Sequence, residues 1–360
     1  MKLEFNKSVS RILDYLVFPR LYYFIDEEDK ENEETFGSLI REDFMTYVEE
    51  VTKAFAPYKD IIEKYYQKDI YANIDFIQIV INAYPPYGYT DEKAYLNDLL
   101  NIDDLEFRRS FIKALLIVDE EDKHKMIDEK MIDESHAIQY INQLKIDASN
   151  KWNMLIMVQD PKKCLKEFVS LLDKVEPLFN NCYQHKADEV EQVGLELSKK
   201  LSGDTSETLK RMSFNAVNYD FGDNDSCQLY VSAIFPYTLR FIETEPCKIV
   251  WGLEMEYSFQ KLHELNEDKM VQRVKVFKAL GDKTRYDTIR LIASGVSSIK
   301  DIATKLDVSS ATISYHINEF LTSGIISLNR KKDKKSIYDV DYQKLEDVLS
   351  ELRVDLKFPL

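Results

Sequence analysis

The side chains best suited to chemistry lie in the segment SSATISYHINEFLTSG, residues 309–324. Read as a helix, at about 100° per residue, the segment gathers its large apolar residues on one face, which would attach it to a core. They are Ile313, Ile317, Phe320 and Leu321. The other positions are small, polar or aromatic: Ser310, Ala311, Thr312, Ser314, Tyr315, His316 and Asn318. Hydroxyl, amide and small apolar groups contact base edges, so these residues predict binding in the major groove of double-stranded DNA.

This segment contains no Arg or Lys, the residues that most often bind guanine. We therefore expect modest sequence specificity, or a preference for A·T sequences. The absence also favours an alternative, in which the segment is used only for contacts with other proteins.

A cluster of positive charges follows between two short apolar segments. The segments IISLNR and SIYDVD predict two strands joined as a β-hairpin, or wing. The tip of this hairpin carries Arg330, Lys331, Lys332, Lys334 and Lys335. An isolated basic run is most often a solvated loop, but at this place we expect contacts with DNA phosphates. Five such contacts predict a log–log salt dependence with a slope of roughly −4 to −5.

Two shorter helices should position these groups. The sequence DKTR, from Asp282, opens a helix that stops at Gly295. Ser298 lies three residues before Asp301, which resembles a capping box at the start of a second helix. A tight turn at 307–309 leads to the segment described above, which ends at Gly324 in the expected C-terminal cap position. Two helices joined in this way predict a helix-turn-helix, and with the hairpin a winged helix-turn-helix.

Two apolar stripes predict a dimer. The last helix, 341–356, carries apolar residues in steps of three and four, which favours packing against a partner helix. Packing within the chain is the alternative. A two-fold dimer would hold two reading helices about 34–36 Å apart on one face of DNA. The residues assigned to dimerisation are Met270, Val274, Phe277, Leu345, Leu349, Leu352 and Leu356.

The C-terminal ninety residues resemble the ArsR/SmtB family of winged-helix regulators. The resemblance rests on FKALGDKTR (277–285), Ile302-Ala303, Ser309, Ser314-x-His316 and Gly324. It implies a homodimeric bacterial repressor whose operator affinity changes with a signal, often a metal ion. Residues 298–303 lack the cysteines of the metal-sensing members, the last helix lacks His, and Tyr315 replaces the usual Arg. We therefore carry over DNA binding and dimerisation, but not metal sensing.

Charge is distributed unevenly along the chain. The 360 residues have a formal net charge of −16, but residues 271–360 hold 16 basic and 12 acidic side chains, a net charge of +4. The first 270 residues therefore carry −20. Such asymmetry predicts an acidic body joined to a module that binds a polyanion. With only 9 glycines and no phosphate-loop, nucleophile-elbow or metalloprotease motif, the sequence predicts no catalytic residues, no cofactor and no enzyme activity.

The fold class expected is mainly α with a small antiparallel β portion (α+β). Helical periodicity predicts helices at 43–55, 104–118, 163–175 and 187–201, separated by breakers such as Pro161 and Pro177. Between 212 and 257, β-branched and aromatic residues predict three or four antiparallel strands. The domains expected are a helical sensor domain (1–205), a β subdomain (206–265) and the winged helix-turn-helix (266–360).

The acidic N-terminal part is expected to sense an unknown small-molecule or protein effector, of a non-metal kind. An alternative is that this part is catalytic and the winged helix only targets or dimerises it. Glu121-x-x-His124 and Asp133-x-x-His136 resemble metal-binding pairs, but both lie within one charged stretch, so we expect no metal site there or at Cys182-x-x-His185. No apolar segment is long enough for a membrane span, and no signal peptide is evident, so a cytoplasmic location is expected.

Overall fold

The computed structural model describes residues 1–24, 39–67, 75–118, 133–144, 146–222, 224–242, 244–267, 269–296, 298–330 and 338–358. Helices dominate these residues, and two small sheets complete the fold. The structure thus confirms the mainly α, α+β class with a C-terminal helix-turn-helix. The domain boundaries given above stay predictions.

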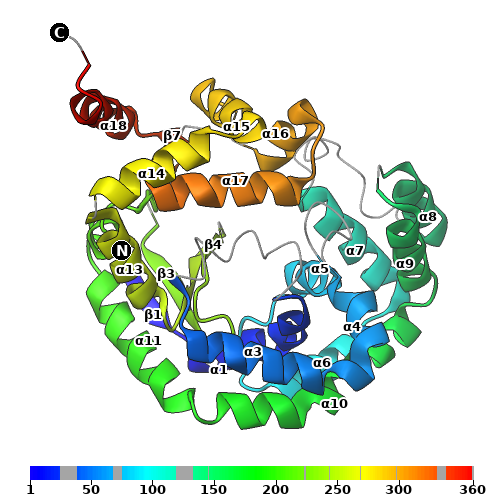
Figure 1. Cartoon of the computed structure of the whole chain (residues 1–360). Coiled ribbons are helices and arrows are strands. Elements are labelled where there is room, and N and C mark those ends of the chain that lie inside the picture. Colours follow the sequence, from blue (N-terminus) through cyan, green and yellow to red (C-terminus); the bar gives the residue numbers. More distant parts are fainter. Residues whose placement is uncertain are drawn as a thin grey trace.

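The N-terminal body forms a curved arc of helices, with β3 and β4 on its inner side, and the C-terminal helices α14 to α17 close the arc into a ring (Figure 1). Its helices are η1 (Phe18–Tyr23), η4 (Ala56–Tyr58), α1 (Lys7–Val17), α3 (Glu42–Ala54), α4 (Lys59–Tyr66), α5 (Phe76–Ala83), α6 (Glu92–Leu100), α7 (Asp104–Val118), α8 (Glu134–Gln143), α9 (Ala148–Gln159), α10 (Pro161–Tyr183), α11 (Ala187–Leu201), α12 (Thr205–Met212) and α13 (Met255–Glu267). Among the helices in the described ranges, none is long and apolar enough to cross a membrane.

The larger sheet has the strand order β1-β3-β5-β4. Its strands are β1 (Lys2–Phe5), β3 (Ser226–Ser232), β4 (Leu239–Ile242) and β5 (Cys247–Gly252). The strands β1, β3 and β5 run parallel, and only β4 is antiparallel to its neighbour. The prediction of purely antiparallel strands is therefore wrong in this sheet. Strand β4 follows β3 in the sequence but pairs with the side of β5 away from β3, so β3 and β5 pair directly and run parallel. Strand β1, from the N-terminus, adds to the other side of β3 and is also parallel to it.

One face of this sheet is apolar and packs on helices α1 and α11. Leu229, Ile249 and Trp251 are buried and lie on the same face, since side chains alternate along a strand and Leu229 and Ile249 are register partners. Helix α11 approaches β1 closely at Gly194, where an added Cβ atom would lie 2.3 Å from the ring of Phe5. Only glycine fits at that contact.

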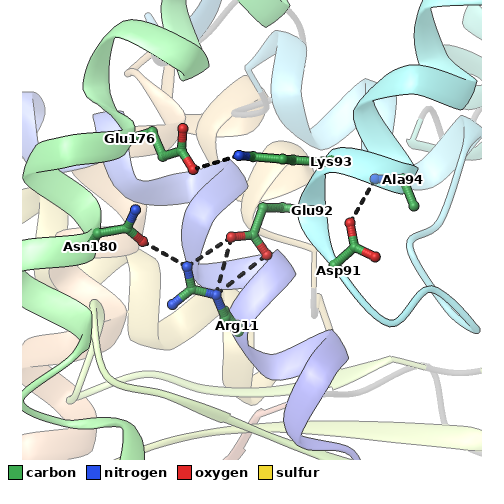
Figure 2. A network of polar contacts seen from close by, with 7 residues as sticks. All are labelled: Arg11, Asp91, Glu92, Lys93, Ala94, Glu176 and Asn180. Carbon is green, nitrogen blue, oxygen red and sulfur yellow. Dashed lines mark hydrogen bonds and ion pairs between the residues drawn. The ribbon is translucent and has the colours of Figure 1, made fainter.

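A polar network ties three helices of the ring together (Figure 2). Arg11 of α1 donates to Glu92 of α6 with a shortest distance of 2.8 Å, and to Asn180 of α10 at 2.7 Å. Asp91 caps α6 by accepting from the backbone N–H of Ala94 at 2.8 Å. Because Glu92 is largely buried, its pairing with Arg11 offsets the cost of removing both charges from water.

The helices predicted from periodicity are present. Helices α3, α7 and α11 match the segments 43–55, 104–118 and 187–201 to within a residue at each end. The expectation that Pro177 breaks a helix is wrong, because this residue lies inside α10. Proline removes one backbone hydrogen bond, but the buried residues Phe168, Val175 and Phe179 hold α10 against the body on both sides of it.

Candidate DNA-binding surface

The helix-turn-helix consists of α15 (Lys283–Ala293), α16 (Ile299–Leu306) and α17 (Ser310–Ser323). Each helix begins at a side chain that accepts a hydrogen bond from the first turn. Asp282 accepts from the N–H of Arg285 at 2.9 Å, Ser298 from that of Asp301 at 3.3 Å, and Ser309 from that of Thr312 at 3.0 Å.

The turns that follow α16 and α17 use left-handed backbone conformations. Asp307, which ends α16, has a φ of 55°, and Gly324, which ends α17, has a φ of 73°. Asp is among the few residues with a side chain that adopt this conformation readily, and glycine does so without strain. The turn at Asp307 thus sets the direction in which α17 leaves α16.

A separate apolar core fixes α17 to the other two helices. It contains Val276, Ala279, Ile289, Ile292, Ile302, Ala303, Ile313, Ile317, Phe320, Ile325, Ile326 and Val348. Three of the four residues assigned to the attaching face of α17 are buried in it, and the fourth, Leu321, is half-buried. The face that remains carries Ala311, which is exposed, and the half-buried residues Ser310, Thr312, Ser314, Tyr315 and Asn318.

His316 does not lie with these residues. Its side chain is only 6% exposed, and neither ring nitrogen has a hydrogen-bond partner among the described residues. Burial, together with the positive charge of Arg285, lowers the pKa of His316 to about 4. The ring is therefore neutral and turned toward α15, so we leave His316 out of the proposed DNA contacts. On the helical wheel it stands beside the core face, and the charges of Asp282 and Arg285 at the start of α15 act on it.

A hairpin follows α17 directly. Its strands are β6 (Ile326–Arg330) and β7 (Tyr338–Val340), which are antiparallel with Ile326 opposite Val340 and Leu328 opposite Tyr338. The tip residues Lys331, Lys332, Lys334 and Lys335, and the side chain of Arg330, lie outside the described residues. Their contacts with DNA stay predictions.

The hairpin is joined by a third strand from the N-terminal body. Strand β2 (Val217–Tyr219) runs parallel to β6, with Asn218 opposite Asn329. The ring of Tyr219 stacks on that of Phe241 in β4, with centroids 4.1 Å apart, and meets the ring of Phe221 edge-on at 4.7 Å. A single short strand thus contacts the body sheet through its side chains and the hairpin through its backbone.

The turn that leads into β2 has an unusual backbone. Phe214 and Asn215 have φ values of 51° and 66°, a left-handed conformation that strains a bulky residue such as Phe. Ser213 fixes the turn, because its hydroxyl accepts from the N–H of Val217 at 3.0 Å. The ring of Phe214 stacks on His263 of α13 at 4.1 Å. Such a constrained turn holds β2 in register with the hairpin.

The two apolar stripes lie on neighbouring helices, α14 (Lys269–Leu280) and α18 (Tyr342–Asp355). Arg273 of α14 forms ion pairs with Glu351 at 2.8 Å and Asp355 at 3.2 Å of α18. Met270 is 60% exposed and Val274 58%. Among the other residues assigned to dimerisation, Phe277, Leu349 and Leu356 are exposed, and Leu345 and Leu352 are half-buried. The two helices thus share ion pairs and the apolar core at Val276 and Val348, and much of their remaining apolar surface faces solvent.

Metal-ligating side chains of the common types do not gather in the described ranges. No cluster of three or more His, Cys, Asp or Glu side chains there could hold a metal ion. Asp133 and His136 contact each other at 2.7 Å, but Asp133 also accepts from the N–H of His136 as the cap of α8. Glu121 and His124 lie outside the described residues.

A family model described as a helix-turn-helix domain matches residues 284–336. The matched segment runs from the first turn of α15 into the hairpin, so it coincides with the geometry above. The chain therefore contains a helix-turn-helix domain, a DNA-binding type of domain. The match does not extend to the ArsR/SmtB family. No curated protein and no solved structure matches the chain.

Proposed function

We propose that this protein is a homodimeric transcriptional regulator of the ArsR type, acting as a repressor whose DNA affinity is set by the N-terminal body. The observation that carries the proposal is the sequence of α15, α16 and α17 followed directly by the hairpin β6–β7. Capped short helices, a left-handed turn and a separate core make this segment a rigid support for one outward-facing helix.

In the proposed complex, the N-terminal half of α17 enters the major groove. Ala311, Tyr315 and Asn318 lie on the side of α17 away from its core, where an amide can pair with adenine and an apolar carbon can contact a thymine methyl group. The basic hairpin tip contacts the phosphates beside this groove. Because α17 has no Arg or Lys, the tip supplies most of the affinity, and α17 supplies the selectivity.

Dimerisation is supported by the exposed apolar residues of α14 and α18. Val274, Met270 and Leu349 are exposed to solvent on two adjacent helices, and a group of exposed apolar side chains usually marks an interaction site. A second copy related by a two-fold axis would cover the same residues on both chains, because such an interface pairs a surface with itself. It would also present two copies of α17 to one face of the duplex.

The pairing of β2 with β6 supports control by the body. A ligand can shift DNA affinity only if it favours one arrangement of the DNA-binding elements over another. Strand β2 is the element through which this can happen, since it packs on Phe241 of the body sheet and also pairs with the strand that ends at the hairpin tip.

The test is DNA binding by the full chain, measured by fluorescence anisotropy on a duplex from upstream of its own gene. A variant with Lys331, Lys332, Lys334 and Lys335 changed to Glu should lose affinity for all duplexes. The slope of log affinity against log salt should flatten by about 0.9 for each phosphate that the variant no longer neutralises. A control with four exposed body lysines changed to Glu, at Lys59, Lys93, Lys162 and Lys199, should keep the wild-type slope. Unchanged binding by the hairpin variant would contradict the proposed role of the tip.

A second candidate function is protein binding through α17. The lack of Arg and Lys on this helix favours it. It predicts that neither specific nor unspecific duplexes bind at low salt, an outcome that the same titration detects.

A further inference from the structure

Three sulfur atoms gather at one end of the larger sheet, where β1, β3 and β5 begin, outside the DNA-binding region. Cys227 of β3 and Cys247 of β5 are register partners on neighbouring parallel strands, so their side chains leave the sheet on the same face. As register partners, the two cysteines lie side by side on that face. The Sγ atom of Cys247 also lies 3.9 Å from Sδ of Met1, the residue that precedes β1.

These sulfur atoms are held in place and have few other partners. Both thiols are buried and not in a disulfide. Their remaining contacts are weak ones to backbone carbonyls, each at 3.8 Å, from Cys247 to Ser226 and from Cys227 to Gln228. The backbone of Met1 is also fixed, because its ammonium group donates to the carbonyl of Gly203 at 2.8 Å. The cluster is therefore a preformed group of soft donor atoms.

The donor set and its size fit a soft monovalent metal ion. Thiolate and thioether ligands select Cu(I), zinc and iron–sulfur clusters, and a set of only three sulfur donors favours Cu(I) over zinc, which takes four ligands. With metal–sulfur bonds of about 2.3 Å, three sulfur atoms around one ion in a plane would lie about 4.0 Å apart. The distance of 3.9 Å between Cys247 and Met1 agrees with this value. The site contains only two cysteines and uses methionine as its third donor, so it is not one of the clusters of three or more His, Cys, Asp or Glu side chains considered above.

A buried positive charge lies on the opposite face of β5 from the cluster and has no anionic partner in the described part of the chain. Lys248 is 7% exposed. Its ammonium group donates to Oγ1 of Thr244 and to the carbonyl of Pro246, and lies 4.5 Å from the centre of the Tyr87 ring. All three partners are neutral, although a buried charge normally requires an opposite one. Because Lys248 follows Cys247 directly in β5, an anionic complex at the sulfur atoms would partly balance its charge across the strand.

We propose that Met1, Cys227 and Cys247 bind one Cu(I) ion through two thiolates and one thioether. Binding releases the two thiol protons to solvent, and the complex of one Cu(I) with two thiolates carries a charge of −1, opposite to that of Lys248. This site differs from the non-metal effector expected from the sequence, where the two cysteines are 20 positions apart and form no metal-binding motif.

The site also gives the proposed regulator a candidate signal, an extension that rests on the proposed function. Ile249, two residues beyond Cys247 on β5, is the register partner of Phe241, whose ring holds Tyr219 of β2. Cu(I) binding should therefore change DNA affinity through β2 and the hairpin. Metal binding is measured without DNA, so failure of the site and failure of the regulator proposal give different results.

The test titrates the reduced full chain with Cu(I) under anaerobic conditions, in competition with a chromophoric Cu(I) chelator. We expect one tightly bound Cu(I) per chain, and X-ray absorption of the complex should show three sulfur neighbours at about 2.3 Å. C227S and C247S should each weaken binding by at least about 100-fold, more than the loss of an outer-shell partner does. The controls C164S and C182S remove the other two thiols and should bind as the wild type does.

Three outcomes would overturn the proposal. The wild type could fail to compete with the chelator, the C182S or C164S variant could lose binding instead, or the absorption spectrum could show nitrogen and oxygen neighbours. Because the spectrum is recorded on the wild-type protein, the test remains decisive even where a serine variant folds poorly.

Discussion

Replacing Tyr219 by alanine should loosen the C-terminal hairpin, although Tyr219 belongs to the body. Tyr219 is buried, stacks on Phe241 and meets Phe221 edge-on. Truncating a buried aromatic residue costs about 3–5 kcal/mol, and each ring contact contributes about 0.5–1.5 kcal/mol of this. Strand β2 has three residues, of which Val217 and Tyr219 are buried against the body, and Tyr219 supplies the ring contacts with the sheet. We expect the free energy for opening the β2–β6 pairing to fall by about 3 kcal/mol.

Hydrogen exchange followed by mass spectrometry measures this effect. A loss of about 3 kcal/mol corresponds to more than about a 100-fold faster exchange of the amides in 326–330, since each 1.36 kcal/mol is tenfold. Y219F keeps the ring and should retain the protection. Y95A removes a buried ring elsewhere in the body, and should lower overall stability without this local change. If exchange at 326–330 stays slow in Y219A, or rises equally in Y95A, then β2 does not couple the body to the hairpin.

Three further predictions concern ionisation and assembly. The pKa of His316 in the folded protein is about 4, below its unfolded value of about 6.5. The unfolded state therefore binds the proton first, and the free energy of unfolding falls by about 3 kcal/mol as the pH drops from about 6.5 to 4. Urea unfolding measures this loss, and H316Q should remove this part of the pH dependence. Asp14 is fully buried and accepts hydrogen bonds from Ser232 and two backbone N–H groups, yet burial raises its pKa to about 7. Its protonated form therefore stabilises the fold below about pH 4, and about 4 kcal/mol is lost as the pH rises to 7; D14N should gain on the wild type over that range, and an equal pH profile for both would contradict the burial argument. V274E places a charge in the proposed dimer interface, so the sedimentation coefficient should fall from the value of a dimer to that of a monomer. A wild type that already sediments as a monomer would refute the interface.

Much of the local structure could be predicted from the sequence, because its signals are local. The apolar period of 3.6 placed helices α7 and α11 where they are observed. Cap residues were equally informative. Ser298 begins α16 by accepting a side-chain hydrogen bond from the N–H of Asp301, and Gly324 ends α17 with a left-handed backbone, so both signals lie within a few residues of the helix end. The helix-turn-helix is built almost wholly from such short-range contacts, so the face of α17 left outside the core could be described in advance except for His316.

The features that were missed depend on contacts between distant parts of the chain. The register of β2 with β6 joins residues more than 100 positions apart, and the strand directions depend on β1 joining from the N-terminus. His316 was placed on a flank because a helical wheel does not show that the rest of the fold buries this position. The pairing of Cys227 with Cys247 likewise exists only once β3 and β5 lie in register.

A footprint of the full chain on the DNA upstream of its own gene tests the central claim most directly. The account predicts two protected half-sites related by two-fold symmetry, about 10–10.5 base pairs apart from centre to centre, and N318A should reduce the preference for them over unrelated DNA. If the chain protects no DNA even at low salt, then α17 and the hairpin do not form a DNA-binding surface and the account is contradicted.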